Sequence, residues 1–415
     1  MVDSTLLTAS QQDTPSGSSL LQHSPSMFSH PSSTVPKALN RRQFLTKAAI
    51  GIGGLSALSS ANAVAALLSP ETLERETGSE NTHCASPTIE TRLFASSNVA
   101  EDSLRNQLAL KRLGCSGFKI INPEVTQRQY LRFAGTDAQR ASDLQNIATG
   151  AIKAPKLLLG VRGGYGAMRL LPMIDWASLG RVMKQQGTIM AGFSDITAIQ
   201  CALLAKGGVG SLAAPMYYSE FGKTQPDKVS CQSFVEAITN PNLSISIPRS
   251  EALISQDHNN DGDVLMSEIT GTLWGGNLTM VTMLAGSDYL PKIDGGIVFL
   301  EDTGEPPYSI ERMLYSLYLA GVFKHQQAIV LGAFSSVAKD SYDSRYDLSR
   351  VTQQLKQATG LPILSGVPFG HVAGKHSLPL GAKCTLTAND TGYQLSFSGY
   401  PTIASDTIHP EALWS

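Results

Sequence analysis

The sequence predicts an α/β fold in two parts: an N-terminal α/β domain with a largely parallel sheet and a smaller, β-rich C-terminal domain. First, short apolar runs alternate with helical patterns of roughly 10–15 residues after Thr91, as in βαβ units. Second, strand-like runs with fewer helices follow after about Asn240. Third, a chain of 415 residues that is 42% hydrophobic can bury more than one core. We therefore expect domains over residues 91–240 and 265–405, with the boundary within residues 235–265.

The N-terminal domain contains apolar runs that are typical of buried strands, with helical patterns between them. The strands are predicted at TRLFASS, FKIINP, PKLLLGV and GTIMAGF, which are residues 91–97, 118–123, 155–161 and 187–193. The helices are predicted at residues 102–114, 137–152, 167–174 and 195–208. In such a sheet, chemistry takes place in the turns at the carboxyl ends of the strands.

The C-terminal domain is predicted mainly from strand-like runs that are rich in β-branched and aromatic residues. They are LSISIPRS, GDVLMSEITGTLWGGN, GGIVFLED, QAIVLGAF, KCTLTAND and GYQLSFSG, at residues 243–250, 262–277, 295–302, 327–334, 383–390 and 392–399.

The region before the first domain predicts a leader. Residues 1–40 are rich in Ser, Thr, Gln and Pro, which predicts disorder. In residues 41–65, Arg41 and Arg42 precede a Gly/Ala-rich apolar run that resembles a twin-arginine export signal, with a Sec signal or an uncleaved helix as alternatives. The run is shorter than the roughly 20 residues of a spanning helix, so we expect no stable membrane anchor. Residues 66–90 are then a linker.

The export signal predicts where the protein works and one of its partners. A twin-arginine signal is an address that the export machinery reads, here through Arg41 and Arg42. We therefore expect a periplasmic or otherwise extracytoplasmic protein. The net charge is −2 and no basic block follows the leader, which argues against nucleic acid as a partner.

The cysteines predict neither a disulfide framework nor a metal site. No C-x-x-C pair occurs, and no His/Cys cluster has zinc-like spacing. We expect no metal and no cofactor, and we interpret the five cysteines as mostly buried small hydrophobes with at least one unpaired thiol. They are Cys84, Cys115, Cys201, Cys231 and Cys384.

The stretch AGFSDITA places Ser194 between a predicted strand and a predicted helix. A serine there can project its oxygen from the sheet edge beside a helix N-terminus, as a nucleophile does. Serine is also a preferred N-cap, and Ile196 stands where G-x-S-x-G has its second glycine. Read locally, Ser194 is better interpreted as a helix cap, with the nucleophile as the alternative.

The glycine turn RGGYG, residues 162–166, also follows a predicted strand. It lacks the G-x-G-x-x-G order of a dinucleotide site. Its glycines would let backbone N–H groups approach a substrate or an oxyanion, and a packing turn between strand and helix is an equal alternative. Arg162 could bind a substrate carboxylate bidentately or form a salt bridge within the fold.

The second half of the chain supplies acidic and histidine candidates. FLEDTGEPPYSIERM carries Glu301, Asp302 and Glu305 directly after a strand, where one acid can orient a histidine and the others are solvated turn residues. PFGHVAGKHSLPLG carries His371 and His376 in a Gly/Pro loop. These two are the best catalytic candidates among the histidines, because a loop histidine between glycines is less suited to a core.

The stretch DHNNDGDVLMSE has the D-x-N-x-D-G-x5-E spacing of a calcium loop. The helices that flank such loops are absent, since both flanks are predicted as strands. We therefore interpret the stretch as a polar hairpin turn and keep calcium as the alternative. The ligand positions would be Asp257, Asn259, Asp261 and Glu268, with Gly262 at the turn.

Five motifs in order resemble the L,D-carboxypeptidase family of muramoyl-tetrapeptide carboxypeptidases and microcin-immunity relatives. They are RGGYGAMRLLPMIDW, GFSD, GTLWGGNLTMV, FLEDTGEPPYSIERML and GHVAGKHSLPLG, and the similarity spans about Thr91 to Ile403. The resemblance implies a serine peptidase whose nucleophile is Ser194 in an α/β N-terminal domain. It also implies that Glu301 and His371, from the C-terminal domain, complete a triad.

The resemblance gives roles to the residues around the triad. We expect the oxyanion hole to use the N–H of Asp195 and that of Gly164 in the glycine turn, and Arg162 to bind substrate. One departure is Ala213-Ala214-Pro215, where relatives often show His-Gly-Pro, which affects local substrate contacts rather than the triad.

The implied substrate is a murein tetrapeptide, cut before its terminal D-alanine. The alternatives are a microcin-immunity-type hydrolase of peptide–nucleotide amides and a non-catalytic murein-binding protein. Export argues against the first, because that toxin acts in the cytoplasm, and the occupied triad positions argue against the second. The family also implies a homodimer.

Overall fold

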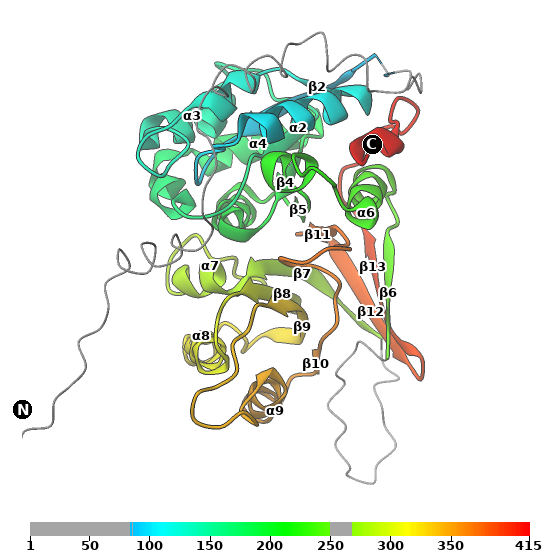
Figure 1. Ribbon diagram of the computed structural model, residues 1–415. Helices are drawn as coiled ribbons and strands as arrows, with labels where there is room; N and C mark the ends of the chain where they lie inside the picture. The colour runs from blue at the N-terminus through cyan, green and yellow to red at the C-terminus, as the bar shows by residue number, and fades with distance from the viewer. Residues whose placement is uncertain (1–83, 85, 250–267) are drawn as a thin grey trace, which may run out of the picture. The chain divides into compact units, whose positions relative to one another are not determined.

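The computed structural model describes Cys84, residues 86–249 and residues 268–415, which belong to one compact unit (Figure 1). The predicted disordered leader and twin-arginine segment lie outside the described residues, as does most of the linker. The described unit contains a parallel-rich sheet built mainly from its N-terminal part and a separate sheet in its C-terminal part. The predicted fold class is therefore confirmed.

The first sheet has six strands in the order β11-β5-β4-β3-β1-β2. All neighbours pair in parallel except β11, which is antiparallel to β5. The leucines of β3 are fully buried, as expected of a central strand covered on both faces. The strands are β1 Ile89–Phe94, β2 Phe118–Ile120, β3 Leu157–Gly160, β4 Ile189–Gly192, β5 Ser211–Ala213 and β11 Leu378–Leu380.

Helices pack around the first sheet and begin at capping residues in the sequence (Figure 1). Asp102 accepts hydrogen bonds from two backbone N–H groups of α2, and Thr136 forms a capping box with Gln139 in α3. Among the described residues, no helix is both long and apolar enough to cross a bilayer. The helices are α2 Ser103–Cys115, α3 Asp137–Ala148, α4 Trp176–Gln186, α5 Thr197–Ala202 and α6 Lys228–Thr239.

The second sheet has seven strands in the order β10-β9-β8-β7-β12-β13-β6. Strands β7 to β10 pair in parallel, and β7, β12, β13 and β6 pair antiparallel. Helices α7, α8 and α9 lie beside the parallel part (Figure 1). The bounds are β6 Ser244–Pro248, β7 Ile269–Asn277, α7 Leu278–Met283, β8 Gly296–Thr303, α8 Pro307–Leu319, β9 Gln326–Ser335, α9 Leu348–Thr359, β10 Ile363–Leu364, β12 Lys383–Asn389 and β13 Gly392–Ser398.

Strand β11 crosses from the second part of the chain to the first sheet. Leu378 of β11 pairs with Ala213 of β5, although they are far apart in the sequence. The buried hydrophobic side chains of both sheets form one contiguous cluster. The loop that carries the histidine candidates, which directly precedes β11, is therefore held against the sheet that carries Ser194.

The segment with the calcium-loop spacing lies outside the described residues, apart from Glu268. It connects β6 to β7, which are strands as expected. Strands β6 and β7 are not neighbours, because β12 and β13 lie between them in the sheet, and the hairpin turn and its calcium alternative stay predictions.

Two predicted helices have a different form in the structure. Residues 195–208 form a short 3-10 helix η4 (Ser194–Ile196), then α5, then a π-helical turn η5 (Leu203–Gly207). Residues 167–174 form a 3-10 helix η3 (Ala167–Met173), because Pro172 has no N–H to donate to an α-helical ladder. The sequence analysis also missed β5, β10 and β11, which are only two or three residues long.

The interpretation of the five cysteines as mostly buried small hydrophobes without a disulfide framework is wrong for two of them. Cys84 and Cys115 form a disulfide, and Cys201, Cys231 and Cys384 are free and buried, as expected. The disulfide arises from the fold, because β1 and β2 pair in parallel and bring the residues just before β1 next to the end of α2. Linear spacing carries no sign of this pairing.

Candidate active site

Ser194 directly follows β4 and has an unusual backbone conformation. Its φ is +65°, which is uncommon for a residue other than glycine and is often found at functional sites. The residue in the N-cap position of η4 is Phe193, and no side chain caps either η4 or α5. The interpretation of Ser194 as a helix cap is therefore wrong. The strand–turn–helix geometry is that of a nucleophile elbow.

The glycine turn packs against Ser194. A Cβ atom at Gly163 would lie 2.7 Å from Ser194 Oγ and 3.5 Å from the backbone nitrogen of Asp195. At Gly164 a Cβ atom would instead meet the side chain of Asn98 at 2.5 Å. Only glycine at position 163 leaves room for the serine hydroxyl. The turn thus lies where an oxyanion hole would be, and the donors expected at Asp195 and Gly164 stay a prediction.

The Asp195 side chain holds the turn that carries Ser194 next to the glycine turn through hydrogen bonds. Its Oδ2 accepts hydrogen bonds from Ser97 Oγ at 2.6 Å and from the Ala167 nitrogen at 3.0 Å. The carboxyl is buried, and burial raises its pKa above the ordinary value. Asp195 therefore ties the start of η4 to the end of the glycine turn.

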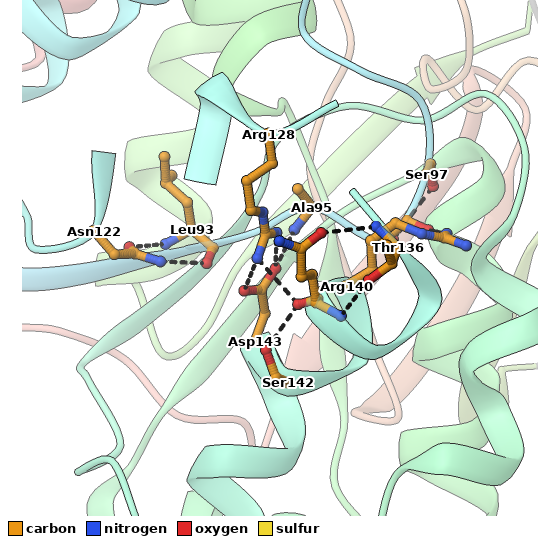
Figure 2. Close-up of polar contacts among 11 residues, drawn as sticks. Leu93, Ala95, Ser97, Asn122, Arg128, Thr136, Arg140, Ser142 and Asp143 are labelled. Carbon is orange, nitrogen blue, oxygen red and sulfur yellow. Dashed lines mark hydrogen bonds and ion pairs between the residues drawn. The ribbon is translucent and has the colours of Figure 1, made fainter. Parts of the chain in front are cut away.

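Buried charged side chains of helix α3 contact the end of β1 and the glycine turn (Figure 2). Asp143 accepts two hydrogen bonds from Arg128, at 2.7 and 3.0 Å, and one from the Ala95 nitrogen at 3.0 Å. Arg140, which is fully buried, donates to the Gly166 carbonyl at 3.1 Å. These contacts fix the end of β1 and the glycine turn to one helix, and the sequence analysis did not identify them.

Arg162 is half-buried beside the glycine turn. It donates to the Val99 carbonyl at 3.0 Å, and its guanidinium lies 5.2 Å from the centre of the Tyr218 ring. Among the residues that the structure describes, no carboxylate pairs with it. The salt-bridge alternative is therefore not observed, and substrate binding stays a prediction.

Glu301 lies near the carboxyl end of β8 and is fully buried. Its Oε1 accepts a hydrogen bond from Asn277 Nδ2 at 3.3 Å, whereas its Oε2 has no partner within the described part of the chain. Burial, reinforced by the negative charge of Asp302, raises the pKa of Glu301 to about 8. A buried carboxylate oxygen without a hydrogen bond lowers the stability of the fold, so its presence indicates a group that can accept a further partner.

Asp302 is a structural neighbour rather than a second candidate. It is buried and accepts from Asn277 Nδ2 at 3.0 Å and from both the backbone and the hydroxyl of Thr279. Asn277 also links the two halves of the site, since its backbone nitrogen donates to Thr197 Oγ1 at 3.1 Å. Asn277 and Asp302 lie in the WGGN and LED segments of the sequence, but the sequence analysis did not assign a role to Asn277.

His371 lies near the turn that carries Ser194, residues 193–195, which we call the nucleophile turn. A Cβ atom at the preceding residue, Gly370, would be 3.1 Å from Glu301 Oε2. The His371 ring centre is 5.0 Å from that of Phe193, the neighbour of Ser194. Although the residue is exposed, the protein around its ring lowers the pKa of His371, and the negative charge of Glu220 counteracts this shift. A lowered pKa favours the neutral imidazole that a general base requires.

The structure thus brings the three triad candidates into one region but does not join them directly. Among the described residues, Ser194, Glu301 and His371 make no hydrogen bond to one another. The other acid of the motif, Glu305, instead accepts from Ser309 Oγ at 2.5 Å.

No metal centre accompanies the site in the described ranges. No group of three or more His, Cys, Asp or Glu side chains there could hold a metal ion. The groups that this region offers are a hydroxyl, an imidazole, a buried carboxyl and backbone N–H donors.

Sequence comparison identifies relatives over the same regions. The profile of the LD-carboxypeptidase N-terminal domain matches residues 92–214, and that of the C-terminal domain matches residues 270–386. The murein tetrapeptide carboxypeptidase of Pseudomonas aeruginosa is 28% identical over 311 residues, covering 71% of this chain and 91% of the relative. The microcin C7 self-immunity protein MccF of Escherichia coli is 26% identical over 315 residues, covering 71% and 89%.

A solved structure agrees with this assignment. The muramoyltetrapeptide carboxypeptidase of Oxalobacter formigenes is 34% identical, with a TM-score of 0.66, and the match covers 75% of this chain and all of that one. The two profiles together with this relative decide the family. The chain belongs to the LD-carboxypeptidase family and is a serine-type carboxypeptidase.

Proposed function

We propose that this protein releases the terminal D-alanine from murein tetrapeptides through a triad of Ser194, His371 and Glu301. One observation carries the proposal: Ser194 stands at φ +65° at the end of a parallel strand, with Gly163 cleared around its hydroxyl. Backbone strain of this kind persists at sites where it serves chemistry. The names of the relatives in Pseudomonas aeruginosa and Oxalobacter formigenes support the murein peptide as substrate.

In the proposed mechanism, Ser194 Oγ attacks the carbonyl carbon before D-alanine while His371 takes its proton. The negative oxygen of the tetrahedral intermediate accepts hydrogen bonds from the N–H groups of Asp195 and Gly164. The carbon–nitrogen bond then breaks as His371 returns the proton to the leaving amine. Water hydrolyses the resulting ester by the same steps in reverse. Glu301 orients the imidazole and stabilises its cation.

The test uses Ser194→Ala with purified protein and murein tetrapeptide, and free D-alanine is measured. Removal of a triad nucleophile should lower kcat by roughly 10⁴-fold or more. Ser142→Ala in α3 is the matched control, because it removes a hydroxyl that bonds only the carbonyl of its own helix turn. Equal D-alanine release by Ser194→Ala and wild type would refute the triad. No release by the wild type would refute the murein substrate.

A microcin-immunity-type activity is the second candidate, favoured by the similarity to MccF, which a solved structure shows with aspartyl sulfamoyl adenosine. The same triad would cleave an acyl–nitrogen bond in a peptide–nucleotide amide. Incubation of the wild type with such an amide and with tetrapeptide under one condition ranks the two substrates by kcat/KM. We expect the tetrapeptide to be preferred.

We further propose that the protein is exported and works outside the cytoplasm. The Cys84–Cys115 disulfide supports this proposal, because disulfides persist in oxidising compartments and are rare in the cytosol. The test is fractionation of cells that express wild type or an Arg41→Lys/Arg42→Lys variant. We expect the wild type in the extracytoplasmic fraction and the variant in the cytoplasm. A cytoplasmic wild type would contradict export.

A further inference from the structure

A buried ion pair that the proposed mechanism does not use lies next to the histidine. Lys375 is 2% exposed and Glu220 is 8% exposed, and Lys375 Nζ lies 3.3 Å from Glu220 Oε1. The other oxygen of Glu220 accepts from the Met216 nitrogen at 2.9 Å. Lysine is almost never fully buried unless it is paired, and burying such a pair costs desolvation energy. A pair kept at this cost calls for a reason beyond stability.

The pair joins the two parts of the chain that form the site. Glu220 lies in the π-helical turn η6 (Tyr217–Phe221), after β5, whereas Lys375 belongs to the histidine loop, which we define as residues 370–377. The backbone of the histidine loop also donates three hydrogen bonds to side chains of α6 and its N-cap residue. They run from Gly374 to Asp227, from Lys375 to Ser230 and from Ser377 to Ser233, at 2.9, 3.0 and 2.9 Å.

The charges of the pair act close to His371. Lys375 Nζ is 5.1 Å from the centre of the Phe193 ring, and the His371 ring centre is 5.0 Å from the same point. A third charge that acts on this imidazole is the carboxylate of Asp302, in β8 of the second sheet. Glu301 lies next to Asp302, and its Oε2 would be 3.1 Å from a Cβ atom at Gly370, the residue before His371.

We propose that Lys375 and Glu220 are positioning residues for His371: their ion pair holds the histidine loop against the nucleophile turn and balances opposite charges beside the imidazole. The proposal rests on the proposed function for its kinetic consequences only. Neither residue touches the reacting atoms in this assignment. They affect the position of the imidazole and the pH at which it becomes protonated.

The two charges shift His371 in opposite directions. The cation of Lys375 lowers the pKa of His371, and the anion of Glu220 raises it. Lys375→Met should therefore raise the pKa of His371, and Glu220→Gln should lower it. The double variant removes both charges and should return the pKa close to its wild-type value. A merely structural role would give no such pattern of signs.

The kinetic test measures kcat/KM for D-alanine release between pH 5 and 10 for these three variants. The general base must be neutral, so the acid limb of the profile should move to higher pH in Lys375→Met and to lower pH in Glu220→Gln, by roughly half a unit or more. The double variant should keep the wild-type limb but lose about 10- to 100-fold in kcat, because the loop has lost its tie. Shifts of the same sign, or none, in folded variants would overturn the proposal.

A second readout does not depend on the substrate. The titration of His371 is followed by NMR of its imidazole, which is identified by its absence in His371→Gln. Lys375→Arg keeps the cation and should leave the pKa of His371 unchanged, even if Lys375→Met does not fold. Lys206→Met is the matched control, since Lys206 pairs with Asp288 at 3.9 Å on the surface. If the wild type releases no D-alanine, the proposed function fails, but the NMR titrations still decide this inference.

Discussion

Asp195 and Glu301 are both buried carboxyls at the carboxyl ends of parallel strands, one in each half of the site. Asp195 Oδ2 accepts two hydrogen bonds, at 2.6 and 3.0 Å. Glu301 accepts one long hydrogen bond, at 3.3 Å, and its other oxygen has no partner among the described residues. Glu301 therefore keeps one buried acceptor open, whereas neither oxygen of Asp195 is buried without a partner in the described part of the chain.

The difference leads us to predict a structural role for Asp195 and a catalytic role for Glu301. A buried acceptor without a donor costs about 1–3 kcal/mol, so we expect it to persist where a partner arrives during function. In the proposed triad that partner is the His371 imidazole, and a Cβ atom at the neighbouring Gly370 would lie 3.1 Å from Glu301 Oε2. In sequence the two acids are equivalent, since each follows an apolar strand.

The largest expected effect tests this contrast directly. Glu301→Gln should lower kcat by about 10³- to 10⁴-fold at pH 8.5, where Glu301 is largely ionised in the folded protein, because a neutral amide cannot stabilise the imidazolium. Asp195→Asn should keep most of kcat but lose about 1–3 kcal/mol of unfolding free energy, because an uncharged amide oxygen accepts from Ser97 and Ala167 more weakly than a carboxylate oxygen does. The measurements are D-alanine release and urea denaturation on both variants. Equal losses of activity would break the distinction between the two acids.

A second prediction uses the pH dependence of stability. The pKa of Glu301 is about 8 in the folded protein and near 4.5 in the unfolded chain. The folded state therefore binds the proton more tightly, so stability from this group is present below pH 4.5 and is lost as the pH rises to about 8. Relative to Glu301→Gln, the wild type should lose a few kcal/mol, on the order of 3, over this window. Urea titrations of both proteins at pH 4.5, 6 and 8.5 measure it. If the difference in unfolding free energy between the two proteins does not depend on pH, the interpretation of Glu301 Oε2 as an open acceptor is wrong.

The sequence predicted the fold well where periodicity is local. The parallel strands of the first sheet and the capped helix that starts after Thr136 follow from patterns within about 15 residues. Strand β11 could not be predicted in this way, because it is three residues long and is defined by its pairing with β5. The Cys84–Cys115 disulfide could not be predicted for the same reason, since it depends on the pairing of β1 with β2.

The candidate site shows the same limit. Around Ser194 the sequence favours a helix cap, and only the folded chain excludes it, because Phe193 takes the N-cap position and no side chain caps η4 or α5. Likewise, Lys375 and Glu220 are ordinary charged residues in the sequence, and their burial as a pair results from a contact across 155 positions. Motifs predicted the residues that we propose to react, whereas the contacts around them emerged only with the fold.

A smaller effect tests the space around the nucleophile. Gly163→Ala would place a methyl group 2.7 Å from Ser194 Oγ, so the hydroxyl must move and kcat should fall by about 10²-fold. Some stability should be lost as well, because the methyl group would also lie 2.8 Å from Ser194 Cβ, which is fixed to the backbone. Gly114→Ala is the matched control, since a Cβ atom there meets nothing within 4 Å. A Gly163→Ala enzyme with wild-type kcat would show that the turn does not limit the position of the serine.

The smallest expected effect concerns the arginine beside the turn. Arg162 is held by the Val99 carbonyl and the Tyr218 ring and has no carboxylate partner in the described ranges, so its remaining N–H groups are free to bind a substrate carboxylate. Arg162→Met should raise KM for the tetrapeptide by about tenfold with little change in kcat, and Arg162→Lys should fall between, because lysine cannot bind bidentately. Arg181→Met on the exposed side of α4 is the control. A fall in kcat with unchanged KM would contradict this role. Arg162 would then belong with Asp195 to the residues that position Ser194.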